Sequence, residues 1–160
     1  MDIEEVKIKL PEGANIILGY SHFIKTVEDL NEIVRTSMPN FRYSVVFSEA
    51  SGDRLIRYEG NDKELVDAGI DTIKRISAGH TFAIYLRDAY PINILNAVKQ
   101  CQEVGTIYAA TANPLSVVVY KGADGNAVLG VIDGQSPKGT ETEEDKNKRK
   151  SFLRMIGYKS

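Results

Sequence analysis

The chain has 160 residues, of which 42% are hydrophobic and 26% charged, and its 20 basic and 22 acidic side chains give a net charge of −2. These values fit one domain over residues 1–160 with a real core, and they give no reason to expect a nucleic-acid partner. No apolar run approaches the roughly 20 residues of a membrane span, and the N-terminus lacks a signal-peptide pattern. We therefore expect a cytoplasmic protein without a membrane partner. The single cysteine, Cys101, excludes an internal disulfide and is predicted to be a small core residue.

The first third of the chain predicts two strands and a helix. Apolar residues alternate with lysines over 6–10, which indicates a half-buried strand, and the apolar run over 15–20 indicates a more fully buried one. Thr26 then begins a helix, and Asp29 stands at the third helical position in the manner of a capping box.

The middle of the chain predicts a second strand pair and a second helix. A buried strand over 43–48 and a short strand over 55–58 are separated by a turn. Asn61 or Asp62 caps the next helix, which we expect to end at Gly79.

The last part predicts four strands and two helices. Strands are expected over 81–86, 106–111, 116–120 and 127–132, and Pro91 opens a helix after the first of them.

A polar stretch over 138–150 is followed by Phe152, Leu153 and Ile156 at helical spacing, so we predict a charged C-terminal helix docked by its final turns. About eight strands and four helices in mixed order indicate an α/β (mixed α+β) fold, with one or two mixed sheets and helices packed on a face.

One junction combines residues suited to phosphate chemistry. Ser21, His22, Lys25 and Thr26 lie where a predicted strand runs through a loop into a helix N-terminus, which can bind an anion. A histidine there could accept a phosphoryl group, and Lys25 could hold its oxygens. The alternative is a surface or capping histidine beside a solvated lysine.

Two further residues at predicted element ends are candidates. His80 enters a strand directly after a glycine, where a ligand or another backbone could approach, although it could equally bond a helix-end carbonyl. Glu49 ends an apolar strand, where a carboxylate can bind Mg²⁺, accept from a ribose hydroxyl or act as a base. It could also be an ordinary charged strand end.

Later strand ends offer a purine site and a metal ligand. The strand that contains Thr111 ends in small residues, so a flat ring could approach it, and Asn113 can both donate to and accept from adenine. Asp133 follows a strand and precedes a glycine, a common place for a metal-binding carboxylate. Asn113 and Asp133 are also ordinary turn residues.

Several signatures are missing from the sequence. It contains no P-loop, no dinucleotide-binding glycine motif, no protein-kinase motif set, no zinc spacing and no nucleophile elbow. The residues by themselves therefore lead no further than a soluble α/β domain with several polar strand ends.

Seven blocks of the sequence resemble the adenosine-specific kinase family. They occur in order through nearly the whole chain, namely SHFIKTVEDL (21–30), EASG (49–52), GN (60–61), GH (79–80), PINILN (91–96), ATANP (110–114) and GVIDG (130–134).

The resemblance implies a compact α/β subunit, a homo-oligomer (trimer or hexamer), a pocket for adenosine or AMP, and ATP-dependent phosphorylation of adenosine with Mg²⁺. It also implies a histidine that holds a phosphoryl group. We favour His22 over His80 because the adjoining helix end and Lys25 offer a phosphohistidine more partners. The residues expected to bind the nucleotide are Ser21, Thr26, Glu49, Asn93, Thr111 and Asn113, and the expected metal ligands are Asp133 and Glu49.

Two other functions are compatible with the same blocks. The protein could be a non-catalytic module that binds adenosine or AMP for regulation, or the blocks could form the contacts of a structural oligomer. Steady-state turnover distinguishes a kinase from the regulatory module. A test of nucleoside binding distinguishes both of these from a purely structural oligomer, which would bind no nucleoside.

Overall fold

The structure is a computed structural model that describes residues 1–160. Its strands occur singly or in runs of two or three between the helices. In chain order they are β1 (Ile3–Lys7), β2 (Asn15–Ser21), α1 (Thr26–Ser37), β3 (Arg42–Ser48), β4 (Ile56–Gly60), α2 (Lys63–Ile76), β5 (Thr81–Arg87), a 3₁₀ turn (Pro91–Asn93), α3 (Leu95–Lys99), β6 (Val104–Thr111), β7 (Leu115–Lys121), β8 (Asn126–Asp133) and α4 (Glu143–Met155).

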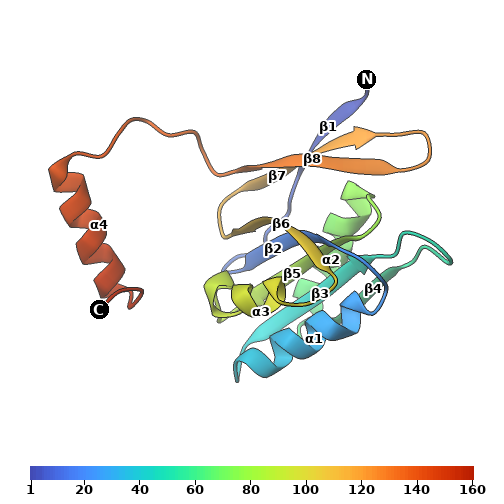
Figure 1. Cartoon of the computed structure of the whole chain (residues 1–160), viewed down its shortest axis with the longest axis horizontal. Helices are drawn as coiled ribbons and strands as arrows, with labels where there is room; N and C mark the ends of the chain where they lie inside the picture. The colour runs from blue at the N-terminus through green and yellow to red at the C-terminus, as the bar shows by residue number, and fades with distance from the viewer.

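The strands form two sheets (Figure 1). The larger has the order β4-β3-β5-β2-β6, and the smaller has the order β1-β7-β8. This arrangement confirms the predicted mixed α+β class with helices packed on a sheet. We had expected sheets with both parallel and antiparallel strands. Every strand pair is in fact antiparallel, so neither sheet is mixed in strand direction.

The larger sheet separates two hydrophobic cores because successive side chains of a strand point to opposite faces. On β2, Ile16 and Leu18 enter the core shared with α2 and the smaller sheet, whereas Ile17 enters the core shared with α1 and α3. All three side chains are fully buried. The interior strand β2 is thus covered on both faces, which fixes the position of the loops at its ends. Cys101 is buried in the second core, as predicted.

The helix ends differ from the prediction at two places. Asp62 caps α2 as expected, because its side chain accepts a hydrogen bond from the Leu65 N–H. That helix ends at Ile76, with Ser77 rather than Gly79 in the left-handed conformation. The predicted capping box of α1 is absent, because the N-cap residue is Lys25 and no side chain caps the helix.

The C-terminal helix α4 stands away from the rest of the chain at the end of an extended segment (Figure 1). None of its residues is buried, so the prediction that its final turns dock on the same chain is wrong. Phe152, Met155 and Ile156 expose 52%, 77% and 41% of their surface instead. None of the helices combines the length and the apolarity that crossing a membrane requires.

Candidate functional site

The two histidines of the chain lie side by side at one end of the larger sheet. His22 follows β2 and His80 precedes β5, and these strands pair with Tyr20 opposite Thr81. The Ser21 N–H donates to the His80 carbonyl at 2.9 Å. The ring centroids of His22 and His80 are 5.7 Å apart, so two candidates separated by 58 positions in the sequence form one cluster.

An aromatic residue that we did not single out, Tyr20, completes this cluster. Its ring packs edge-on against both histidines, with centroids 5.0 Å from His22 and 5.6 Å from His80. The Tyr20 hydroxyl lies 3.4 Å from His80 Nδ1. The sequence contained a weak signal for this contact, since Tyr20 and His22 are two residues apart at the end of a strand and so share a side.

His80 is held tightly and partly buried. Its ring stacks on Phe47 with centroids 6.0 Å apart, and its backbone N–H donates to the Ser48 carbonyl at 2.8 Å. A Cβ on the preceding Gly79 would lie 2.8 Å from the Ala50 Cβ, so the glycine admits a neighbouring backbone rather than a ligand. Burial, and then the nearby His22, lowers the pKa of His80. The ring is therefore neutral at neutral pH.

His22 is exposed, and its surroundings leave room beside the ring. Its N–H donates to the Glu103 carbonyl at 2.9 Å, which fixes the backbone. Gly105 lies next to the ring, and a Cβ there would stand 3.6 Å from His22 Nε2. The ring nitrogen thus faces a position without a side chain.

The segment after His22 forms a turn whose first N–H groups are unpaired. The N–H groups of Thr26, Val27 and Glu28 already donate to carbonyls three residues earlier. The N–H groups of 23–25 have no acceptor within the chain. The unpaired donors that an anion could use therefore lie one turn before the start of α1, directly after His22.

Ser21 and Thr26 are fully buried behind this turn, so a ligand cannot reach them here. Their hydroxyl oxygens are 2.7 Å apart, and the Thr26 hydroxyl also donates to the His22 carbonyl at 2.9 Å. In this structure both hydroxyls help to hold the turn.

Lys25 is paired with two carboxylates. Its Nζ lies 3.0 Å from Asp29 and 3.8 Å from Glu103, and the hydrogen bond to Asp29 raises the pKa of Lys25. Glu103 is buried, and nothing in the sequence marked it. Its neighbour Cys101 has a thiol whose pKa is raised to about 11 by burial and next by Glu103, so that thiol is protonated at neutral pH.

Glu49 lies near the histidines but is already occupied. One of its carboxylate oxygens accepts from the Leu55 N–H at 2.9 Å, and Arg57 contacts both oxygens. These interactions, that of Leu55 foremost, lower the pKa of Glu49. Glu49 is therefore an ionised partner of Arg57 and a poor general base.

Three other predicted residues form a separate cluster at the opposite end of the sheet. Asp133 Oδ1 accepts from the Thr111 hydroxyl at 2.8 Å and from the Asn113 amide at 3.1 Å. Thr111 of β6 pairs with Ile16 of β2 at this end, whereas Tyr20 of β2 lies at the histidine end. Four residues of extended strand separate Ile16 from Tyr20, so the two ends are about 13 Å apart.

This separation corrects two expectations for a single chain. Adenine and ribose cannot rest on Asn113 and Glu49 together, and one Mg²⁺ cannot bridge Glu49 and Asp133. Asn93 belongs to the far end too, because it follows the end of β5, and its side chain accepts from the Tyr90 N–H at 2.8 Å.

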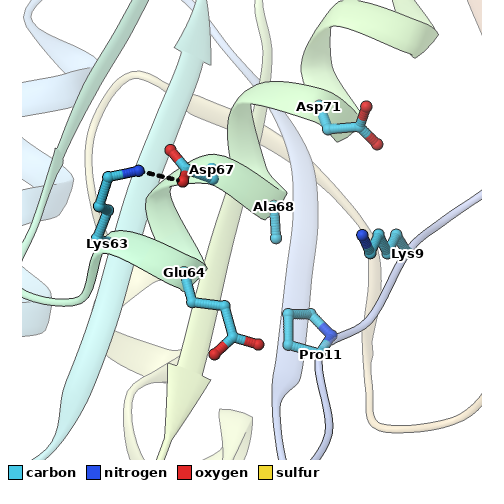
Figure 2. Close-up of a pocket in the computed structure, with 7 residues that line it drawn as sticks. All are labelled: Lys9, Pro11, Lys63, Glu64, Asp67, Ala68 and Asp71. Carbon is cyan, nitrogen blue, oxygen red and sulfur yellow. Dashed lines mark hydrogen bonds and ion pairs between the residues drawn. The ribbon is translucent and has the colours of Figure 1, made fainter.

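Two cavities differ in how well they suit a nucleotide. The one in Figure 2 has a volume of 530 Å³ and lies between α2 and the segment before β2. Its walls include three carboxylates, two lysines and only one hydrophobic residue, and one lysine, Lys63, is bonded to Asp67, so the cavity is a poor fit for a purine or a phosphate. A second groove of 480 Å³ runs between the start of α1 and β4, and half of its lining residues are hydrophobic.

Two comparisons with known proteins found matches. Residues 6–159 match the model of a family described as "Adenosine specific kinase". The crystal structure of PH1918 protein from Pyrococcus horikoshii OT3 is similar at 40% identity with a TM-score of 0.95, over 99% of this chain and 98% of that one. No curated protein matches the chain. A family match over nearly the full length shows the relationship that the ordered sequence blocks had suggested: the chain belongs to the adenosine-specific kinase family.

Proposed function

We propose that the protein binds adenosine or AMP and phosphorylates adenosine with ATP at the end of the sheet where the two histidines meet. The observation that supports this most is the position of His22. The ring is exposed, and the three unpaired N–H groups of 23–25 follow it directly. Backbone N–H groups in such a turn are donors for phosphate oxygens.

The nucleoside would lie in the groove between α1 and β4. Ile24 and Val27 line one side of it, and Ile56 and Tyr58 line the other. Tyr58 exposes 56% of its surface, so a purine could stack on its ring. Lys25 also lines this groove, three residues after His22, and would face the phosphate end of the ligand.

ATP would arrive with Mg²⁺ on its phosphates, because the Glu49 carboxylate that we expected to bind the ion is already in use. Arg57 already neutralises Glu49. At the far end Asp133 is exposed, and its hydrogen bonds from Thr111 and Asn113 reach Oδ1 only, which leaves Oδ2 for a metal. In an oligomer, the far end of a neighbouring subunit could lie against the histidine end of this one. Its polar residues would then contribute to the site, namely Asn93, Thr111, Asn113 and Asp133.

Two routes of transfer fit this arrangement. In one, a His22 ring nitrogen attacks the γ-phosphorus, the bond to ADP breaks, and adenosine then takes the phosphoryl group as its 5′-hydroxyl loses a proton. In the other, the 5′-hydroxyl attacks ATP directly. In both, Lys25 and the unpaired N–H groups would offset the charge on the transferring oxygens.

A regulatory module that binds adenosine or AMP without turnover is the second candidate. The observation that favours it is that Lys25 and Arg57, the two cations of the groove, are both paired with carboxylates. Phosphate binding would have to compete with those pairs, which is compatible with slow or absent turnover.

A multiple-turnover assay separates the two. Purified protein, Mg-ATP and adenosine are incubated, and AMP is followed by chromatography in the wild type, His22→Ala and the exposed surface control Lys74→Ala. A kinase yields AMP well in excess of enzyme, and His22→Ala lowers the rate by about 100-fold or more while Lys74→Ala does not. One equivalent of label on the protein without accumulating AMP supports the regulatory module. Label on the His80 peptide contradicts the choice of His22.

The proposal includes a homo-oligomer, a trimer or hexamer, in the cytoplasm where ATP is available. Its support is α4, which packs on nothing in its own chain while exposing Phe152, Met155 and Ile156. A second copy of the chain would supply the missing partner surface.

A further inference from the structure

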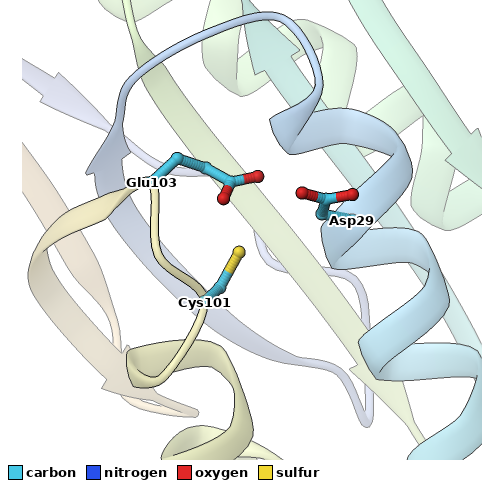
Figure 3. Close-up of side chains that lie close together, drawn as sticks. All are labelled: Asp29, Cys101 and Glu103. Atoms are coloured by element: carbon cyan, nitrogen blue, oxygen red, sulfur yellow. The ribbon is translucent and has the colours of Figure 1, made fainter.

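Three side chains that can bind a metal meet beside α1. Asp29 lies in the first turn of α1, Cys101 follows α3, and Glu103 precedes β6. One ligand atom from each lies within 4.8 Å of the other two, and Figure 3 shows all three pointing toward one another. Asp29 comes from one segment and Cys101 and Glu103 from another, so the packing of α1 against the 101–103 segment assembles the cluster.

The buried state of Glu103 is the observation that points to a missing ligand. Its side chain has no exposed surface, and neither carboxylate oxygen has a hydrogen-bond partner. The nearest cation is Lys25 Nζ at 3.8 Å, which is half exposed and bonded more closely to Asp29. A buried carboxylate with so little compensation is costly, and buried charges in proteins are normally paired or bound to a metal.

We propose that Asp29, Cys101 and Glu103 form a site for a thiophilic divalent cation such as Zn²⁺. One thiolate sulfur and one oxygen from each carboxylate would supply three ligands, which suits Zn²⁺ rather than Mg²⁺ or Ca²⁺. On binding, the Cys101 thiol loses its proton to solvent and a metal–sulfur bond forms.

The ion has a way in, and the site has room for water as a fourth ligand. A cleft of 360 Å³ between α1 and the 101–103 segment is lined by all three ligands and by Glu32. Lys25 Nζ lies 3.0 Å from Asp29 and 3.8 Å from Glu103, so it would compete with the cation for these carboxylates and be displaced by it.

The site adjoins the histidine cluster but does not depend on the proposed kinase function. The Glu103 carbonyl accepts the His22 N–H, and Lys25 lies three residues from His22. Occupancy would release Lys25 from Asp29. The binding test below involves no nucleotide, so its outcome is separate from that of the turnover assay.

Titration of the full chain with Co²⁺, followed by Zn²⁺, tests the site. The protein is first freed of metal with a chelator. We expect one equivalent of Co²⁺ to produce a thiolate-to-metal charge-transfer band and tetrahedral d–d bands, and Zn²⁺ to abolish them. Cys101 is the only cysteine, so such a charge-transfer band can come from no other residue. A wild-type protein that shows no such band overturns the proposal.

Variants define the ligand set. Cys101→Ser should remove the charge-transfer band, and Glu103→Gln should weaken Co²⁺ binding by about 10-fold or more. Lys25→Met should strengthen binding because it removes the competing cation. Glu32→Gln, which lines the same cleft without belonging to the cluster, should leave binding unchanged. A band that survives in Cys101→Ser, or an affinity that Glu103→Gln does not change, contradicts the three-ligand site.

Discussion

His22 and His80 share Tyr20 as a neighbour, but they differ in burial and therefore in what each ring can do. His80 stacks on Phe47 and is partly covered, whereas His22 is exposed beside Gly105. An incoming phosphorus atom needs open space in line with a ring nitrogen, and His22 has that space. His80 is better placed to support the cluster than to accept the phosphoryl group.

The space beside His22 can be filled without touching a histidine. In Gly105→Val the new Cβ would lie 3.6 Å from His22 Nε2, so the valine methyl groups would fill the space beside the ring. Valine is well tolerated in a strand. We expect phosphoryl labelling with radioactive ATP to fall by about 10-fold or more, with little change in the urea midpoint. Gly130→Val is the matched control, since nothing lies within 4 Å of a Cβ there. Equal labelling in both variants contradicts His22 as the acceptor.

The lowered pKa of His80 predicts how stability depends on pH. Between that pKa and the ordinary value of 6.5, the unfolded state binds more protons than the folded state. The contribution of His80 to stability is therefore complete above about pH 6.5 and is lost as pH falls through the lowered pKa. Urea unfolding at several pH values should show the wild type losing stability relative to His80→Asn as the pH falls below about 6.5. A difference that stays constant with pH contradicts the assignment.

At the scale of elements, the two helices that flank the sheet begin in different ways. α2 has a capping aspartate, whereas α1 has none and is preceded by the turn that holds His22. The missing cap leaves donors exposed at the surface, where water or an anion can accept from them. The difference between these two helix starts agrees with a structural role for one and an anion-binding role for the other.

The cap of α2 should contribute measurably to stability. The Asp62 carboxylate accepts from the Leu65 N–H at 3.1 Å, so Asp62→Ala should lower the free energy of unfolding by about 1 kcal/mol. Asp62→Asn keeps an acceptor in the same place and should retain most of that stability. Chemical denaturation of the three proteins measures both effects. An Asn variant as unstable as the Ala variant would assign the loss to the ion pairs of Asp62 with Arg42 and Arg87 instead.

At the scale of the whole molecule, the open question is what covers α4. Its capping box at Thr142 sets where it starts, but a helix of 13 residues without tertiary contacts is marginal in water. The apolar residues of its last turns would gain most from burial. This is why we expect α4 to find its partner surface on another subunit.

Truncation and charge substitution test that expectation. Sedimentation of the full chain should show a trimer or hexamer, and removal of residues 141–160 should give a smaller species. Phe152→Glu combined with Met155→Glu should have the same effect, because a charge would have to be buried in the contact. Lys150→Ala, on the polar part of α4, should not. A full chain that sediments as a monomer contradicts the oligomer.

The sequence by itself determined most of the elements and the family. Strand and helix periodicity is a local property, so β2, α1, β3, α2 and β5 begin within a residue or two of their predicted positions. The Asp62 cap followed from the same local chemistry, and the ordered blocks alone indicated the family.

Only the tertiary structure decided which residues form a site. Strand pairing joins positions far apart in the chain, and it brought His22 to His80 while it separated Glu49 from Asp133. Packing between α1 and the 101–103 segment buried Glu103, a residue whose sequence neighbours predicted nothing. The direction of α4 also lay outside what periodicity can give, because an apolar stripe predicts that a helix packs but does not identify the surface on which it packs.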